Sequence, residues 1–179
     1  MLTTGDTRII DPEFAFVGPI GFDVGAVIGN LLLAYLAQEG HEAAPHARDA
    51  YRAWILDQVV AVWVGFHDRF LALWRQASEG EAYVAGVFTS PQDEAALDAE
   101  RRRFLRLLFE DTLAFGGLKM IRRILGLAHV EDLESIADPA RRAICERKAL
   151  RLGRALVVGG AKFSGVADLI EAALQTANC

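Results

Sequence analysis

The sequence predicts a mainly α protein, a single domain over residues 1–179 in which a short N-terminal β-hairpin precedes about six helices. A length of 179 residues suits one domain, and a chain that is 53% hydrophobic and 24% charged can bury a core. Apolar residues recur at three- and four-residue steps along most of the chain. Glycine and proline interrupt that pattern at intervals typical of helix lengths.

The overall charge and composition exclude several classes of protein. A net charge of -5 argues against a general nucleic-acid binder, which needs a basic surface. Cys145 and Cys179 form no disulfide framework and suit a reducing compartment. The N-terminus lacks the apolar segment of a signal peptide, and the longest apolar run, 24–37, is too short to span a bilayer. We therefore expect a soluble cytoplasmic protein with no nucleic-acid or membrane partner.

The N-terminal residues 1–22 are expected to form a hairpin and a loop. Residues 8–10 favour a short strand, which needs residues 1–4 to pair back on it. Pro12 ends this strand because proline cannot donate to a ladder. Residues 23–179 are then expected to form a helical bundle.

The first helix is expected over 24–38, with Asp23 as its N-cap and Gly40 as its C-terminal stop. Nearly every residue in this stretch is apolar. A helix that is apolar on all sides belongs in the interior of a domain. We therefore expect this helix at the centre of the bundle.

A long amphipathic helix is expected over 46–76, opened by Pro45. Its aromatic residues favour core packing over a ligand-stacking role. The next helix is expected to start at Ser90-Pro91 and to end before Gly116-Gly117. The arginine run 101–103 on this helix is interpreted as a solvated face in preference to a phosphate-binding one.

Arg122 and Arg123 stand in an apolar segment after the paired glycines. Adjacent helical positions point about 100° apart, so both arginines cannot face open water without exposing their apolar neighbours. At least one is expected to point inward, where it needs a carboxylate or a bound anion. Two further helices are expected, over 140–158 after the Asp138 cap and from Ser164 to about residue 177.

Asp11 and Glu13 form a D-x-E pair directly after the predicted strand. Mg²⁺ prefers oxygen ligands and is often held by one or two carboxylates. Proline between the two acids stiffens the turn. This short pattern also occurs in ordinary surface turns, so both interpretations stay open. For Asp23 a structural role is favoured over catalysis.

Two long segments carry a family resemblance: IDPEFAFVGPIGFDVGAVIGNLLLAYLAQEG and GGLKMIRRILGLAHVEDLESI. Together they closely resemble the C-terminal lobe of 5-methylthioribose kinases. The resemblance implies the large helical C-lobe of a protein-kinase-like fold, related to choline kinase and aminoglycoside phosphotransferases. It also implies transfer of the ATP γ-phosphate to the 1-hydroxyl of 5-methylthioribose in methionine salvage, with Mg²⁺, by an enzyme that tends to form homodimers.

The same resemblance implies roles for individual residues. Asp11 matches a magnesium ligand, and Glu13 matches the partner that binds or orients the metal. Asp23 matches an acid that braces the catalytic loop. Arg122 and Arg123 match twin arginines near the sugar and the transferring phosphate, where positive charge stabilises the phosphoryl group.

The chain also departs from the family pattern. The N-lobe and a catalytic loop of the form HGDLHTGS, whose Asp acts as the base, are expected upstream of Met1, so no catalytic residue is expected in this chain. Met1 therefore resembles a mid-protein residue, from a truncated gene or a mis-set start. We expect the chain alone to be inactive and, because Phe14, Phe16 and Val17 would be exposed, poorly soluble.

Two alternatives stay open at this point. One is a kinase of a sister family that acts on another small alcohol. The other is a non-catalytic helical module that forms a homodimer through the long aromatic helix.

Overall fold

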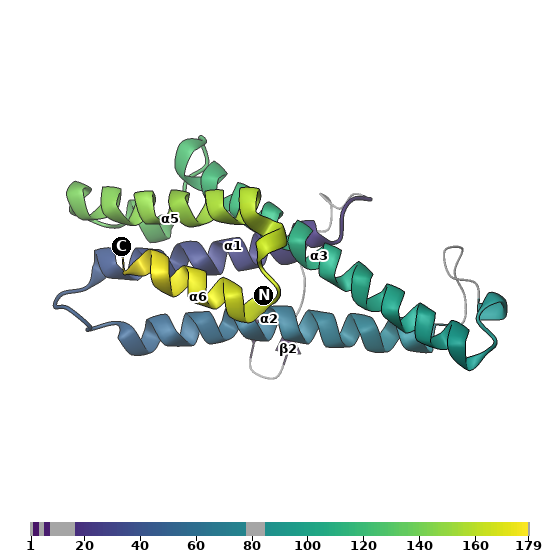
Figure 1. Ribbon diagram of the computed structural model, residues 1–179. Helices are drawn as coiled ribbons and strands as arrows, with labels where there is room; N and C mark the ends of the chain where they lie inside the picture. The colour runs from purple at the N-terminus through teal and green to yellow at the C-terminus, as the bar shows by residue number, and fades with distance from the viewer. Residues whose placement is uncertain (1, 4–5, 8–16, 78–84, 179) are drawn as a thin grey trace.

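The computed structural model describes residues 2–3, 6–7, 17–77 and 85–178, and within these ranges the protein is mainly α, as predicted. Strands β1 (Leu2–Thr3) and β2 (Asp6–Thr7) pair antiparallel, with Leu2 opposite Thr7. The α-helices are α1 (Gly21–Ala37), α2 (Asp49–Gln76), α3 (Pro91–Leu125), α4 (Glu131–Glu134), α5 (Pro139–Gly159) and α6 (Val166–Ala177) (Figure 1). Short 3₁₀ turns cover Gln38–His41 (η2), Ala85–Val87 (η3) and Gly160–Lys162 (η4). The strand predicted over 8–10 lies outside the described residues.

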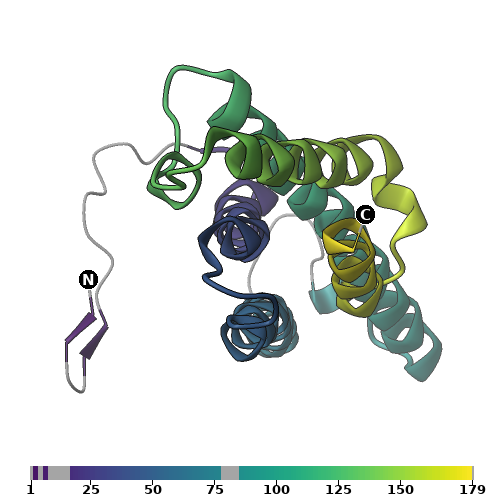
Figure 2. The same cartoon turned by 90° about the vertical axis from the view of Figure 1, so that its left-hand side faces the viewer.

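Helix α1 runs through the centre of the bundle, as its sequence predicts. An end-on view shows α1 with α5 on one side and α2 on the other (Figure 2). Ile28, Leu32 and Leu33 are fully buried. An apolar helix is stable here because its neighbours cover most of its circumference.

The predicted N-cap role of Asp23 is wrong. Helix α1 begins at Gly21, and the N-cap position is Ile20, which makes no side-chain capping bond. Asp23 is exposed in the first turn of α1. There its negative charge interacts favourably with the helix dipole, but it makes no capping hydrogen bond.

The helical stretch Gly21–His41 is longer than the apolar run in the sequence suggests. Its 21 residues are enough, by length and composition alone, to cross a membrane, so the length argument against a span is wrong. In this structure 56% of its most apolar window is buried within the bundle, as in the core helix of a soluble protein. The absence of a membrane partner stays a prediction.

The predicted stop at Gly40 is also wrong, because the chain continues through η2 to His41. A Cβ atom at Gly40 would lie 2.3 Å from Cδ1 of Ile136, which is itself buried. Gly40 therefore makes room for Ile136. Helix α2 begins at Asp49, three residues later than predicted, after a turn in which His46 has a positive φ of 68°.

The largest difference from prediction is in α3, which runs through Gly116 and Gly117 without a break. Their role is to let helices approach closely. A Cβ at Gly29 of α1 would lie 2.7 Å from the carbonyl oxygen of Gly116, and a Cβ at Gly117 would lie 2.5 Å from that of Gly153 in α5. Contacts this short leave no room for a side chain, so the glycines allow α3 to pack closely against both α1 and α5.

The aromatic residues of α2 form ring contacts with α3. Trp63 lies 4.5 Å from Phe109 between ring centroids, and Phe70 stacks on Phe104 at 5.9 Å. These contacts confirm the core-packing interpretation for this part of the helix. Tyr51 and Trp54 differ, because they stack on each other at 5.7 Å but remain 50% and 52% exposed.

The start of α3 is closed by a reciprocal cap. The Asp93 backbone N–H donates to Ser90 Oγ at 3.2 Å, and the Ser90 backbone N–H donates to Asp93 Oδ2 at 3.0 Å. The hydrogen bonds from Ser90 lower the pKa of the Asp93 carboxyl below its usual value. Asp138 likewise caps α5 as predicted, accepting from Ala140 N at 2.8 Å.

We expect Ser90→Ala to destabilise the protein by about 1 kcal/mol at pH 7, the usual cost of a lost N-cap. Because the folded-state pKa of Asp93 is depressed, its contribution is present above about pH 4 and is lost as pH falls through the folded pKa. The difference between wild type and variant should therefore shrink in acid. Urea unfolding at pH 7 and pH 3 measures it, with Ser135→Ala, whose hydroxyl bonds only to the Glu131 carbonyl, as the control.

Candidate anion-binding site

The predicted metal ligands Asp11 and Glu13 lie outside the described residues, as do Phe14 and Phe16. The magnesium site in the segment 1–22 therefore stays a prediction. Within the described ranges, no group of three or more His, Cys, Asp or Glu side chains could hold a metal ion. Val17 is described and is fully exposed.

Arg122 and Arg123 lie in the last turn of α3 and have different environments. Arg122 is exposed, whereas Arg123 is half-buried. One of the pair therefore turns inward, as predicted, but its partner is not a carboxylate. Arg123 Nη1 donates to the backbone carbonyl of Ala128 at 3.0 Å, while its buried Nε has no hydrogen-bond partner among the described residues. The loop after α3 thus holds this guanidinium through one nitrogen and leaves another unsatisfied.

Lys119 lies one turn before the two arginines and was not singled out by the sequence. It is half-buried, and its pKa is lowered, first by desolvation and then by repulsion from Arg123 and Arg122. No Asp or Glu among the described residues lies within 4.0 Å of any of the three cations. We call Lys119, Arg122 and Arg123 the cationic cluster.

The rest of α3 shows the opposite pattern. Arg102 pairs with Asp98, and Arg106 Nη1 lies 2.8 Å from Glu110 Oε1. Asp98 also receives Arg75 from α2 at 2.8 Å. A group of cations without carboxylate partners among the described residues is suited to binding an anion, because a phosphate or carboxylate would supply acceptors to the exposed guanidinium of Arg122. The chemistry therefore supports anion binding at the C-terminal end of α3.

Asp23 is not brought into this cluster by any ion pair among the described residues. Its role as a brace for a catalytic loop stays a prediction. At the start of the last helix, Asp168 accepts hydrogen bonds from both Ser164 N and Ser164 Oγ, each at 2.6 Å. These bonds lower the pKa of Asp168 and join the first turn of α6 to the loop before it.

The interpretation of residues 101–103 as a solvated face is wrong for Arg101. Only 9% of Arg101 is exposed, and its guanidinium carbon lies 6.0 Å from the centre of the Trp74 ring. Its buried Nε finds no partner in the described part of the chain, and Nη1 lies 3.9 Å from Asp98 Oδ1. Arg102 and Arg103 are exposed, as expected. Helical spacing alone could have shown this, because Arg101 lies on the same face as Leu97, Leu105 and Leu108.

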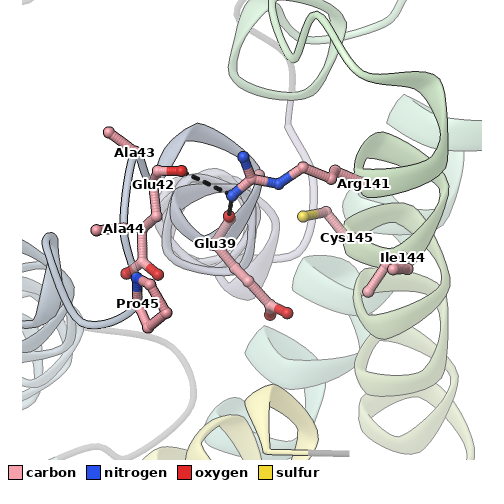
Figure 3. Close-up of a pocket in the computed structure, with 9 residues that line it drawn as sticks. Glu39, Glu42, Ala43, Ala44, Pro45, Arg141, Ile144 and Cys145 are labelled. Atoms are coloured by element: carbon pink, nitrogen blue, oxygen red, sulfur yellow. Dashed lines mark hydrogen bonds between the residues drawn. The ribbon is translucent and has the colours of Figure 1, made fainter.

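A separate cavity of about 480 Å³ lies between η2, the loop that follows it and α5. Arg141 crosses one side of it and donates through Nη2 to the carbonyls of Glu39 at 2.6 Å and Glu42 at 2.8 Å (Figure 3). Cys145 lines the wall, and burial raises the pKa of its thiol, which makes it a poor nucleophile. The sequence did not predict this cavity, whose polar groups mainly hold the loop to α5.

Near this cavity, the buried Lys148 links α5, η2 and α6 through hydrogen bonds. Lys148 of α5 donates to Glu39 Oε2 at 2.6 Å and to the Ala177 carbonyl at 2.7 Å, at the C-terminal end of α6. Only 9% of Lys148 is exposed. Its position among Cys145, Ala149 and Leu152 on the buried face of α5 was the signal available in the sequence.

The chain is similar to methylthioribose kinases along nearly its whole length, which confirms the family resemblance seen in the sequence. It is 44% identical over 172 residues to methylthioribose kinase 2 of Oryza sativa subsp. japonica and 40% identical over 173 residues to the methylthioribose kinase of Escherichia coli O45:K1 (strain S88 / ExPEC). The alignments cover 95% and 97% of this chain but 40% and 41% of these relatives. The chain thus spans about two fifths of the length of the relatives it matches. No family model matches it.

Proposed function

We propose, from this similarity, that the chain is the C-terminal lobe of an ATP-dependent S-methyl-5-thioribose kinase that phosphorylates the sugar 1-hydroxyl in methionine salvage. The observation that carries the proposal is 44% identity sustained over 95% of the chain. A cytoplasmic, homodimeric enzyme is part of the same proposal.

The cationic cluster gives the proposal a chemical basis. Phosphoryl transfer depends mainly on positioning and on stabilising charge at the phosphoryl oxygens. Arg122 is exposed and unpaired among the described residues, so it can reach a substrate without breaking an ion pair. Arg123, held by Ala128, presents a second guanidinium in a fixed position. In this proposal the two arginines bind the sugar substrate and the transferring phosphate.

The co-substrate ATP would bring Mg²⁺, with Asp11 and Glu13 as its protein ligands. Carboxylate oxygens are the donors that this ion prefers. When bound, the ion neutralises charge on the phosphates of ATP. Residues 1–22 would then form the metal-binding part of the lobe, and residues 23–179 the bundle that supports it.

The proposal places the catalytic base outside residues 1–179. In the family pattern the base belongs to a loop that this sequence does not contain. The described residues include a set of unpaired cations but no Asp–His or Glu–His pair beside them. We therefore expect this chain alone to show no kinase activity.

A coupled ADP-release assay with ATP, Mg²⁺ and 5-methylthioribose tests the proposal. It compares this chain with a chain extended to the full length of the relatives. We expect activity only in the extended chain, and we expect Asp11→Ala to abolish it. Activity towards other small alcohols but not 5-methylthioribose would support the sister-family kinase instead. Activity in the short chain would overturn the claim that an outside base is needed.

A non-catalytic dimerisation module is the second candidate, and the surface of α2 favours it. A groove of about 480 Å³ on α2 is lined by Val62, Phe66, Phe70 and Leu73, with Arg69 as its charged residue. Apolar surface of this kind often marks a protein interface. If both chains were inactive in the assay, this candidate would lead, and sedimentation of this chain as a dimer would support it.

A further inference from the structure

The three members of the cationic cluster share one face of α3. Lys119 precedes Arg122 by three residues and Arg123 by four. In an α-helix, residues at these spacings are neighbours, with Cβ atoms about 5–6 Å apart. A ligand that reaches the two arginines therefore also lies within reach of the Lys119 ammonium group.

This arrangement costs folding stability. Like charges at i,i+4 repel each other, and Lys119 is partly desolvated as well. Other arginines of α3 pair with carboxylates one turn away, Arg102 with Asp98 before it and Arg106 with Glu110 after it. Folding alone would favour an acidic or neutral residue at position 119.

The helix dipole does not explain a lysine at this position. Cations are favoured within the last turn of a helix, and the effect falls off beyond it. Arg122 and Arg123 lie in that last turn, but Lys119 lies six residues before Leu125, where α3 ends.

We propose that Lys119 is a third anion-binding residue, which acts with Arg122 and Arg123 on a ligand that carries at least two negative charges on phosphoryl oxygens. This inference rests on the proposed function and extends it, because two arginines can balance a single phosphoryl group whereas three cations suit a diphosphate or longer polyphosphate. In this proposal the Lys119 ammonium group, which has three N–H donors, binds phosphoryl oxygens that the planar guanidinium groups leave free.

The three lysines of the chain make the experiment direct. In protein labelled with ¹³C at lysine, Lys119, Lys148 and Lys162 each give one Cε signal, assigned by substitution. We expect inorganic pyrophosphate to shift the Lys119 signal and to raise the pKa of Lys119. Lys148, already bonded to Glu39 and Ala177, and the exposed Lys162 should not respond.

Substitution gives the affinity. We expect Lys119→Gln to weaken pyrophosphate binding by about tenfold, an effect of about 1.4 kcal/mol. Lys162→Gln is the matched control and should leave the binding unchanged. Equal loss in both variants, or no response of the Lys119 signal at millimolar pyrophosphate, would overturn the proposal.

A stability measurement separates ligand binding from a structural role. The pKa of Lys119 is lower in the folded state than in the unfolded state. Below the folded-state pKa, folding is therefore penalised because the charged ammonium group loses hydration. This penalty disappears as pH rises from the folded-state pKa to the pKa of the unfolded state. Lys119→Gln should therefore unfold at the same or a higher temperature than wild type. A clear loss of stability would assign Lys119 a structural role instead.

The two proposals can fail separately. Pyrophosphate binding is measured on this chain and needs no kinase activity. If the extended chain phosphorylates 5-methylthioribose but Lys119 does not respond, only the role of Lys119 is wrong. If Lys119 responds but the extended chain is inactive, the kinase assignment is wrong and the anion site stands.

Discussion

We expect Arg122→Gln, in a chain extended to the full length of its methylthioribose kinase relatives, to lower kcat by about 10²- to 10³-fold, the usual cost of removing one preorganised charge that stabilises a transition state. Arg122 is exposed and makes no ion pair among the described residues, so the substitution breaks no described structural contact. The loss should therefore appear in kcat more than in stability. The coupled ADP-release assay and a thermal melt of the same preparation measure both.

Arg102→Gln is the matched control for this prediction. Arg102 is also an exposed arginine of α3, but it pairs with Asp98 some 20 residues from Arg122. Breaking an exposed pair costs about 0–1 kcal/mol of stability and should leave kcat unchanged. If Arg122→Gln and wild type had similar kcat values in the extended chain, Arg122 would have no role in the reaction.

The second large effect concerns the crossing of α1 and α3. We expect Gly29→Ala to destabilise this chain by about 2 kcal/mol, because the new methyl group would lie 2.7 Å from the Gly116 carbonyl oxygen and overpacking of this kind costs about 1–3 kcal/mol. A backbone atom cannot rotate aside as a side chain can. The helices must separate instead, which loosens the core around Leu32 and Leu33. Urea unfolding followed by circular dichroism measures the change.

Gly65→Ala is the matched control, because it makes the same change in another helix. The nearest atom to a Cβ at Gly65 is Arg69 Nη1, at the end of a flexible side chain 3.5 Å away. Helix propensity then dominates, and we expect a gain of about 0.5–1 kcal/mol. The two substitutions should thus have opposite signs. A gain in both would mean that α1 and α3 do not cross as closely as the structure indicates.

Part of this fold could be predicted from the sequence because helix caps and helix burial depend on residues close together in the chain. The Ser90-Pro91 and Asp138-Pro139 pairs marked the starts of α3 and α5 because a capping side chain bonds to backbone within three residues. The apolar α1 segment indicated a central helix because no face of it favours water. The inward turn of one of the two arginines followed from helical geometry, and the family resemblance from two long motifs.

The functional residues were predicted less completely than the helices. Asp11 and Glu13 lie outside the described residues, so the D-x-E interpretation stands on the sequence and the resemblance alone. Lys119 was missed because its significance depends on what is absent from its surroundings. A sequence shows that a lysine precedes two arginines by one turn, but not that the described residues place no carboxylate within ion-pair distance of it.

By itself, the sequence determined the helical class, the central position of α1, the starts of α3 and α5 and the kinase resemblance. Only the tertiary structure decided what Gly40 and Gly116-Gly117 do, and that Arg101 packs over Trp74. The physical reason is that glycine has two opposite uses. Along the chain it weakens a helix through backbone entropy, so a local pattern predicts a break. Between helices its missing Cβ lets two backbones approach within van der Waals contact, and that benefit depends on a partner far away in sequence.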